Sequence, residues 1–439
     1  MGTTMLNRRR LLAAGSAVLA APAIVRAATP VTLTYSDWHL AEPVWGRSLA
    51  EAFAQFEGEN PDIKVRPEPV AYGQRDVRYA TAFRGGRGPD VFSLDSNPIK
   101  QFIREGWLMD LAPFIAKEGG VSTWTGQFYE PTIKVVGDEK GGIFGVPKTY
   151  VPIVMFYNKP MLEAAGVTAA PKTWAEFRDA AKRLTKSSAG GGQTDQWGTT
   201  MVLGQGGFDL RFPVVLRGFG GDILSPDYTR SRLDEPAARE AFSFVVGLIN
   251  DDRAMPPGVL QVDANAARQL LATKRIGMAF EAAWAYPIVA DMNKDLDAWN
   301  TLQVAPVPMK DPAGNHIRST LNMKSLHINP KTASADASWK LVRFLTDRQR
   351  AEKWYVDNNL LSPRRAVNAE FPKIQASASA KLMEAELNHS AFLPLIPQWP
   401  EINETFRQSM HQAVTRSKTP EQALADAHKQ VEAILQRKT

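Results

Sequence analysis

The fold is decided by the stretch Lys148-Thr-Tyr-Val-Pro-Ile-Val-Met-Phe-Tyr-Asn-Lys-Pro-Met-Leu-Glu-Ala-Ala-Gly166, closely followed by Pro171-Lys-Thr-Trp-Ala-Glu-Phe177. The apolar run over 151–157 predicts a buried strand that continues directly into a helix. After a short loop, a second helix is predicted to begin at a capping box formed by Thr173 and Glu176. A buried strand followed by helices indicates a sheet that is covered by helices.

A second marker lies upstream at Gly88-Pro-Asp-Val-Phe92, where a turn leads into a strand and then into a helix that ends at Gly106. Together, and in this order, the two blocks resemble the family 1 extracellular solute-binding proteins of ABC transporters, of the sugar-binding, maltose-binding-protein-like type. The resemblance covers essentially the whole chain after residue 27. It implies a two-lobed α/β periplasmic-binding-protein fold, each lobe a helix-covered and mostly parallel sheet, with a ligand cleft between the lobes.

The first 27 residues have the features of a targeting segment. Asn7-Arg8-Arg9-Arg10-Leu11-Leu12 resembles a twin-arginine signal, and Val25-Arg26-Ala27 is a small-residue cleavage site. The uncharged stretch between them is shorter than the roughly 20 residues that a membrane span needs. We therefore expect export to the periplasm with cleavage after about Ala27, rather than an uncleaved N-terminal anchor.

Cysteine and charge narrow the class of protein further. The chain contains no cysteine, which excludes disulfides, thiolate metal sites, a cysteine nucleophile and the attachment point of a lipid anchor. Removal of the first 27 residues, which hold four arginines and no acid, lowers the net charge from +6 to +2. Charges of both signs alternate along the remainder, which argues against nucleic-acid or membrane-surface binding. We expect a diffusible monomer.

Strands and helices alternate along the chain, which predicts sheets covered by helices. Predicted strands occupy 31–36, 63–66, 91–94 and 276–280. Predicted helices occupy about 42–58, 74–84, 98–105, 174–184, 236–250 and 264–274. The resemblance to the family implies a further strand at 321–328 and further helices at 333–346 and 420–436. The polar segment Ser187–Gln196 is predicted to be a flexible surface loop, since it lacks the Lys-Ser/Thr of a phosphate-binding loop.

After residue 27 the chain has 412 residues, more than one hydrophobic core usually serves, so two lobes are expected. The resemblance implies an N-terminal lobe of 28–148 and 318–360 and a C-terminal lobe of 149–317 and 361–439. The chain would cross between the lobes near 148–152, 308–318 and 357–365.

Ligands of open α/β sheets lie beyond the carboxyl ends of the strands, so two facing sheets would place strand-end loops on both walls of one cleft. Sugars suit such a cleft when aromatic faces cover their C–H surfaces and polar side chains meet their hydroxyls. In the first lobe, the candidates are Trp38 and His39 after the first strand, and Asp95 and Asn97 after the third. The alternative for Asp95 and Asn97 is a helix N-cap before Pro98.

The second lobe and the crossings supply the other candidates. The resemblance implies a stacking role for Trp284, with Glu281 and Tyr286 as its companions, although a core tryptophan is the alternative. Tyr150 lies at the first crossing, where it would face the cleft or pack the hinge. The resemblance also implies an aromatic-acidic ligand loop at Phe208, Asp209 and Arg211. It implies a cleft-edge position for Arg364.

These residue types favour an uncharged mono- or oligosaccharide or a sugar derivative. Arg211 and Arg364 leave an anionic sugar derivative or a glycerol phosphodiester open. A ferric site would favour a cluster of tyrosines, and consecutive tyrosines are absent from the sequence. A polyamine site would favour several acidic residues in the cleft.

A secreted enzyme is the alternative from another class, most plausibly a glycoside hydrolase with two carboxylates. However, the sequence contains no G-x-S-x-G or H-E-x-x-H signature, and its six histidines show no metal-ligand spacing. We therefore expect a binding protein that is not an enzyme and uses neither cofactor nor metal. It would close around its ligand by a hinge and deliver the ligand to the permease subunits of an ABC transporter.

Overall fold

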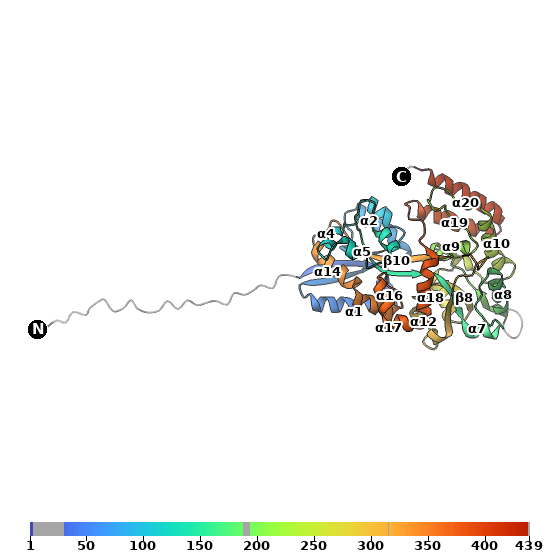
Figure 1. Ribbon diagram of the computed structural model, residues 1–439, viewed down its shortest axis with the longest axis horizontal. Helices are drawn as coiled ribbons and strands as arrows, with labels where there is room; N and C mark the ends of the chain where they lie inside the picture. The colour runs from blue at the N-terminus through green and yellow to red at the C-terminus, as the bar shows by residue number, and fades with distance from the viewer. Residues whose placement is uncertain (3–29, 188–193, 315, 438–439) are drawn as a thin grey trace.

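The computed structural model describes residues 1–2, 30–187, 194–314 and 316–437, which fold into two lobes joined by several crossings of the chain (Figure 1). The predicted signal segment and most of the predicted loop at 187–196 lie outside the described residues. Within the described ranges, none of the helices has the length and apolar character that crossing a bilayer requires.

The first lobe contains a six-stranded sheet in the order β11-β10-β3-β1-β2, with β4 paired to β10. Its strands are β1 (Val31–Asp37), β2 (Ile63–Pro69), β3 (Val91–Asp95), β4 (Val146–Pro152), β10 (Ser319–Ile328) and β11 (Ser390–Ala391). β1 runs parallel to β2 and β3, as the alternation of strands and helices predicts, whereas β10 runs antiparallel to β3 and β4.

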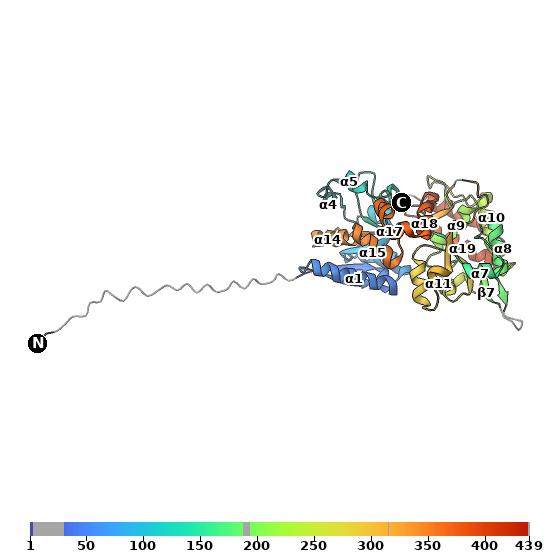
Figure 2. The same cartoon turned by 60° about the horizontal axis from the view of Figure 1, so that its bottom comes forward.

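Helices cover this sheet on its outer faces (Figure 2). They are α1 (Pro43–Glu59), α2 (Arg75–Arg84), α3 (Ile99–Arg104), α4 (Ala112–Ala116), α5 (Val121–Thr125), α6 (Glu130–Val136), α14 (Ala335–Thr346) and α15 (Arg348–Asn358). α1 buries one apolar stripe, formed by Trp45, Leu49, Phe53 and Phe56, against the sheet and α15. The helix predicted at 42–58 is therefore confirmed, together with the face that it buries.

The second lobe contains a five-stranded sheet in the order β6-β7-β8-β5-β9. Its strands are β5 (Val154–Asn158), β6 (Lys186–Ser187), β7 (Thr194–Thr199), β8 (Ile276–Glu281) and β9 (Leu302–Ala305). Of the four pairings, only β7 with β8 is parallel, so the mostly parallel arrangement expected for this lobe is wrong in this detail. Val154, where β5 begins, pairs with Glu281, where β8 ends. A strand that begins at the cleft must run away from it, against the strands that end there.

The helices of the second lobe surround this sheet, with α19 and α20 packed beside α10 (Figure 1). They are α7 (Lys159–Ala164), α8 (Trp174–Leu184), α9 (Phe208–Gly218), α10 (Pro236–Asn250), α11 (Ala264–Ala272), α12 (Ala285–Met292), α13 (Ala298–Thr301), α18 (Ala378–Glu386), α19 (Trp399–Val414) and α20 (Pro420–Leu435). α16 (Arg365–Glu370) instead packs on α15 of the first lobe, and α17 (Pro372–Ala376) connects it to α18. The predicted capping box of α8 is confirmed. The Thr173 hydroxyl accepts from the Glu176 N–H at 3.1 Å, and the Glu176 carboxylate accepts from the Thr173 N–H at 3.1 Å.

The run predicted as one strand over 151–157 is divided between the two sheets. β4 ends at Pro152, which pairs with Leu321 of the first lobe, and β5 begins two residues later. Between them, Ile153 is fully buried and donates its N–H to the Thr320 carbonyl. The prediction of a single strand is wrong because both halves are equally apolar, and hydrophobicity does not record the change of partner.

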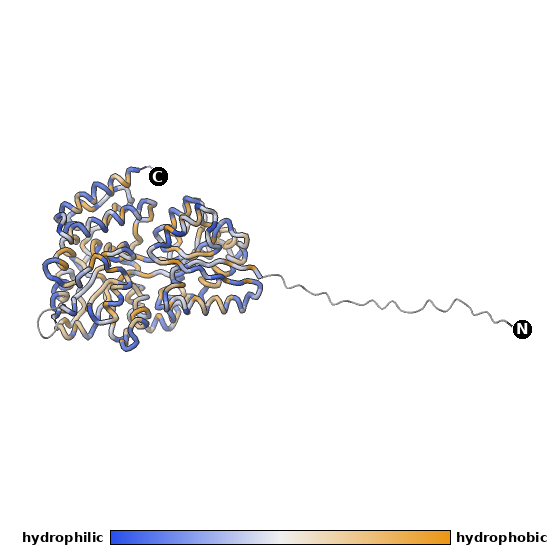
Figure 3. Tube along the Cα trace, turned by 180° about the vertical axis from the view of Figure 1, so that it is seen from behind, coloured by the Kyte–Doolittle hydropathy of each residue, from blue (hydrophilic) through white to orange (hydrophobic). Residues whose placement is uncertain are grey.

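Hydrophobic residues concentrate along the central strands of both lobes, and hydrophilic residues on the outward faces of the helices (Figure 3). The strand ends that face the other lobe are the exception, because they carry buried polar and charged side chains. Those nearest the cleft are Asp37, His39, Lys148, Glu281, Asn322 and Lys324. Buried polar groups of this kind need partners, and their partners define the site.

Candidate functional site

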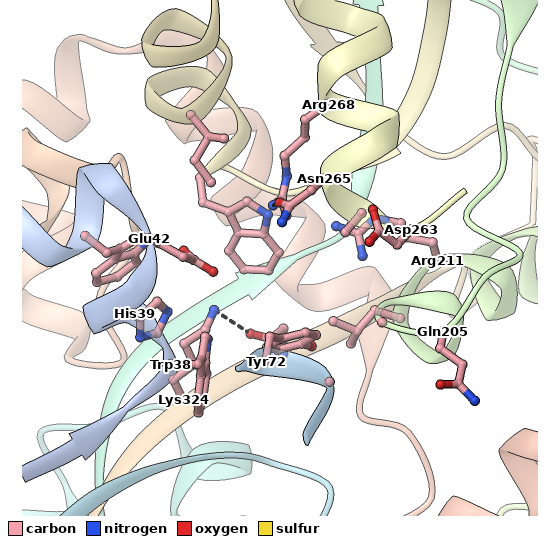
Figure 4. Close-up of a pocket in the computed structure, with 18 residues that line it drawn as sticks. Trp38, His39, Glu42, Tyr72, Gln205, Arg211, Asp263, Asn265, Arg268 and Lys324 are labelled. Carbon is pink, nitrogen blue, oxygen red and sulfur yellow. Dashed lines mark hydrogen bonds between the residues drawn. The ribbon is translucent and has the colours of Figure 1, made fainter. Parts of the chain in front are cut away.

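A cavity of about 280 Å³ lies between the two lobes, where strands of both sheets end. The end of β1 with the following turn, and β10, form one wall, and α9, α11 and the loop after β8 form the other (Figure 4). Its apolar surface comes from four aromatic side chains, Trp38, Trp45, Tyr72 and Trp284, together with Leu210, Ala264 and Ile288. Aromatic faces beside polar groups suit a ligand that has both C–H surfaces and hydroxyls.

On the first wall, β1 ends at Asp37, which caps a short 3-10 helix at Trp38–Ala41 by accepting from the His39 N–H at 3.0 Å. This cap turns Trp38 and His39 toward the cavity, which both line. The imidazole of His39 stacks on Trp45 at 4.2 Å between ring centroids. The predicted placement of Trp38 and His39 at the cleft therefore agrees with the geometry, while ligand contact by either stays a prediction.

Beneath this wall lies a buried cluster centred on Asp37. Its carboxylate accepts from the Tyr35 hydroxyl at 2.8 Å and lies 3.6 Å from the Lys148 ammonium. The Lys148 ammonium also lies over the rings of Trp45 and Trp354, at 5.3 and 4.9 Å. Burial lowers the pKa of Lys148, and the carboxylate of Asp37 opposes that shift. The cluster supports the cavity wall from behind.

Lys324, on β10, reaches the cavity from the same lobe. Its ammonium donates to the Asn322 side chain at 3.3 Å, the bond drawn in Figure 4, and lies 4.1 Å from the ring centroid of Trp284 in the other lobe. Burial lowers the pKa of Lys324 to about 8, although Asp95 raises it. The ammonium thus bridges the two walls.

On the second wall, Glu281 organises Trp284 and two arginines. Its carboxylate accepts from Arg211 Nη2 at 2.5 Å and from the Trp284 indole N–H at 2.8 Å, and it lies 3.2 Å from Arg268 Nε. Burial raises the pKa of Glu281, but the two guanidinium groups outweigh burial and lower it. Glu281 itself does not line the cavity, so the structure gives this predicted site residue a supporting position.

The segment predicted as an aromatic-acidic ligand loop is instead the first turn of α9, which begins at Phe208. Gly207 precedes it with φ +119°, and a Cβ there would lie 2.5 Å from Arg211 Nη1. Glycine therefore gives Arg211 the space to reach Glu281 and line the cavity. Phe208 packs in the core against Phe212 and Phe406, outside the cavity.

Asn97 and Asp209 form a polar contact between the lobes, Asp95 lies within the first lobe, and none of the three lines the cavity. Asn97 donates to Asp209 across the lobes at 3.4 Å, and Asp95 is paired with Arg75 at 2.6 Å. Burial raises the pKa of Asp209, and Arg75 opposes that shift. The alternative of an N-cap is not observed for Asp95 or Asn97, because α3 has Pro98 at its N-cap and no side-chain cap bond.

Three further candidates point away from the cavity. Tyr150 packs against Tyr129 at 5.4 Å, as the hinge-packing alternative predicts. Tyr286 donates to the Leu302 carbonyl at 3.2 Å. Arg364 donates to the Thr346 carbonyl at 2.9 Å in the first lobe, and burial lowers its pKa to about 10. Ligand contact by these residues stays a prediction that the geometry does not favour.

The cavity also contains polar residues that sequence reasoning missed, namely Glu42, Gln205, Asp263, Asn265, Arg268, Asn322 and Lys324. Lys324 left a signal, because it lies inside a strand that contains no other lysine, arginine, aspartate or glutamate. Arg268 and Asn265 left none, since polar residues on one face of α11 look like an ordinary solvated helix face.

Comparisons with known proteins agree with this architecture. The family model for the bacterial extracellular solute-binding protein matches residues 42–351, more than half of the chain. A Brucella abortus (strain 2308) protein named only as a binding protein is 25% identical over 393 residues, which cover 89% of this chain and 90% of that protein. The galactooligosaccharide-binding protein of Bacillus subtilis (strain 168) is 22% identical over 389 residues, covering 86% and 84%.

Two other similarities complete the comparison. The sn-glycerol-3-phosphate-binding periplasmic protein of Escherichia coli is 27% identical over 186 residues, only 42% of each chain. An ABC transporter solute-binding protein from Thermotoga lettingae, solved with α-D-tagatose, has a TM-score of 0.81 and 24% identity, covering 92% of this chain and 100% of that one. At that identity, the structural match shows a shared two-lobed fold.

Proposed function

The chain belongs to the bacterial extracellular solute-binding proteins, and from that premise we propose that it is the substrate-binding component of an ABC importer for a carbohydrate. It captures a mono- or oligosaccharide or a sugar derivative between its lobes and presents it to the permease. The single observation that carries the choice of a carbohydrate is the cavity between the lobes. Its aromatic faces and hydrogen-bonding side chains match the two kinds of surface on a sugar.

The same proposal covers location and chemistry. The chain is exported to the periplasm, its first 27 residues are removed, and it acts there as a monomer without an anchor. It binds its ligand and returns it unchanged, so it is not an enzyme. The lobes comprise 28–148 with 318–360 and 149–317 with 361–439, except that the end of β4 and the short β11 join the sheet of the first lobe, and they move about the crossings between them.

Contacts between the lobes support the proposal that a ligand favours closure. Lys324 faces Trp284, Asn97 bonds to Asp209, and Arg47 pairs with Asp291 at 3.0 Å. Each contact joins the two lobes, yet exposed or long polar contacts stabilise little on their own. A ligand that touches both walls adds the differential affinity that shifts the population to the closed form. The permease then receives a closed, loaded protein.

A thermal-shift screen of the purified protein tests the proposal. The panel contains neutral sugars and polyols, anionic sugars, glycerol phosphodiesters and polyamines, and each ligand is recovered and analysed afterwards. At 100 times its Kd, a ligand adds about 2.7 kcal/mol of stability, which gives a visible shift. A shift with a carbohydrate that is recovered intact supports the proposal. A shift only with a polyamine, or recovery of a hydrolysed sugar, contradicts it.

A further inference from the structure

The geometry around Asp37 fixes what this carboxylate can do. The side chain is fully buried and accepts from the Tyr35 hydroxyl and the His39 N–H, with the Lys148 ammonium 3.6 Å away. Burial raises the pKa of Asp37, but His39 and Lys148 outweigh burial and lower it. Asp37 is therefore ionised, and an ionised carboxylate only accepts hydrogen bonds.

This fixes the tautomer of His39. Its Nδ1 lies 2.7 Å from Asp37 Oδ1, and two acceptors at that distance repel each other, so Nδ1 carries the hydrogen. Burial lowers the pKa of His39, and Lys324 lowers it further, whereas Asp37 and Glu42 oppose the shift. The net shift is downward, so the ring is neutral. Nε2 is then an acceptor. Among the described residues no group donates to it, and the ring of His39 lines the cavity.

The charges around the cavity decide which ligand this acceptor suits. Arg211 and Arg268 share the single carboxylate of Glu281, which leaves one net positive charge, and the carboxylate of Asp263, which lines the same cavity, offsets it. Lys324 has no carboxylate partner among the residues that the structure describes, but Figure 4 shows it beside His39 with the Glu42 carboxylate directed to the same space. An anionic group drawn to Lys324 would therefore meet the His39 lone pair and Glu42.

We propose that His39 Nε2 and the Lys324 ammonium together recognise a hydroxyl group, and that this pair selects an uncharged polyhydroxylated ligand over a carboxylate or phosphate. A hydroxyl donates to Nε2 while it accepts from Lys324, whereas an ionised carboxylate or phosphate group can only accept. Asp37 is the positioning residue, because it holds His39 in the tautomer that accepts. The inference rests on the proposed carbohydrate function and names the ligand class within it.

The first test needs no ligand. Long-range ¹H–¹⁵N correlation spectra of the ¹⁵N-labelled protein report the protonation of each imidazole nitrogen, and a His39→Gln variant assigns the His39 signals by their loss. We expect a protonated Nδ1 and an unprotonated Nε2 from pH 7 to pH 8. A protonated Nε2 over that range overturns the proposal, whatever the protein binds.

The second test compares neutral and anionic partners of the same sugar. Isothermal titration uses glucose against glucuronate, galactose against galacturonate, and glycerol against sn-glycerol 3-phosphate. We expect each neutral member that binds to do so at least about tenfold more tightly, since the anion leaves Nε2 and Glu42 facing a second acceptor. Tighter binding of the anionic members overturns the proposal.

Two variants of His39 distinguish recognition of the ligand hydroxyl from a purely structural role of this side chain. In His39→Gln the amide can present either its donor or its acceptor, so we expect the preference for the neutral member to fall by about tenfold while that member still binds. In His39→Leu the acceptor is lost and the neutral member weakens by a similar factor. Unchanged selectivity in both variants contradicts the proposal. If no carbohydrate binds the parent protein, the proposed function is wrong. The tautomer of His39, measured without ligand, then decides whether this inference stands.

Discussion

Glu281 shows how one side chain shapes the second wall. It accepts from Arg211 and Trp284 and neutralises Arg268, yet it has no exposed surface and no contact with the cavity. A buried carboxylate between two guanidiniums is costly to break, because removal of its charge leaves both cations without compensation. Its role at the residue scale is to hold the orientation of groups that face the ligand.

Glu281→Gln should therefore lower the free energy of unfolding by about 3 kcal/mol. The measurement is chemical denaturation followed by circular dichroism. Glu139→Gln, at an exposed glutamate without an ion pair among the described residues, is the matched control and should change stability by less than about 0.5 kcal/mol. Equal stability of the two variants would contradict a stabilising role of the Glu281 carboxylate.

Lys324 predicts a dependence of stability on pH. Burial lowers its pKa to about 8 in the folded protein, against about 10.4 in an unfolded chain. Between these values the unfolded state binds more protons, so this group makes the folded state more stable as pH rises. Relative to Lys324→Met, the parent protein should gain up to about 3 kcal/mol between pH 8 and pH 10.4.

Denaturation curves of the parent, of Lys324→Met and of Lys373→Met across this range measure the effect. Lys373 is exposed and has no ion pair among the described residues, so its replacement should leave the pH profile parallel to that of the parent. A profile of Lys324→Met that also runs parallel to the parent would mean that Lys324 titrates normally.

At the scale of elements, the sequence predicts most of the fold. The strands at 31–36, 63–66, 91–94, 276–280 and 321–328 and the helices beside them are found within a few residues. They could be predicted because each depends on a local periodicity, a capping residue or a glycine. The residue-level site could not be predicted as well, because its pairs join residues far apart in sequence, as Glu281 and Arg211 do.

Two of the errors at this scale have the same cause. The run at 151–157 serves two sheets, and Phe208–Gly218 forms a helix although its sequence carries Pro213 inside it. In both cases a tertiary partner decides the structure. Hydrophobicity and propensity describe one segment at a time, so neither can show which sheet or which helix lies opposite.

The capping box of α8 belongs to the part that local sequence does determine. Thr173→Ala removes the acceptor of the Glu176 N–H and should lower the free energy of unfolding by about 1 kcal/mol. Thr405→Ala, on an exposed face within α19 where the hydroxyl only bonds back to Glu401, is the matched control and should cost less. Thermal denaturation of both variants measures the difference, and an equal loss would contradict a specific capping role.

At the scale of the whole molecule, the polar contacts between the lobes differ in burial. Asn97 with Asp209 and Arg47 with Asp291 are long or exposed, whereas the bonds from Arg217 to the Ser319 carbonyl and from Asn359 to the Ala283 carbonyl are buried beside the crossings. Weak contacts at the cleft combined with buried contacts at the crossings suit a protein that opens and closes about a hinge. With a carbohydrate that binds, small-angle scattering should show a smaller radius of gyration and a more uniform population than without it. A scattering profile that stays open at saturation would contradict hinge closure as the mechanism.

The central claim is that a carbohydrate binds between the lobes, with Trp284 as a main contact. Calorimetric titration of the panel's sugars into the parent protein and into Trp284→Ala tests it most directly, with Trp299→Ala as the control, since Trp299 is exposed and stacks on Tyr286 away from the cavity. We expect one-to-one binding by the parent and the control, and affinity at least about tenfold weaker in Trp284→Ala, because loss of an aromatic platform costs more than about 1.4 kcal/mol. No binding of any sugar by the parent, or equal affinity in Trp284→Ala, would contradict the claim.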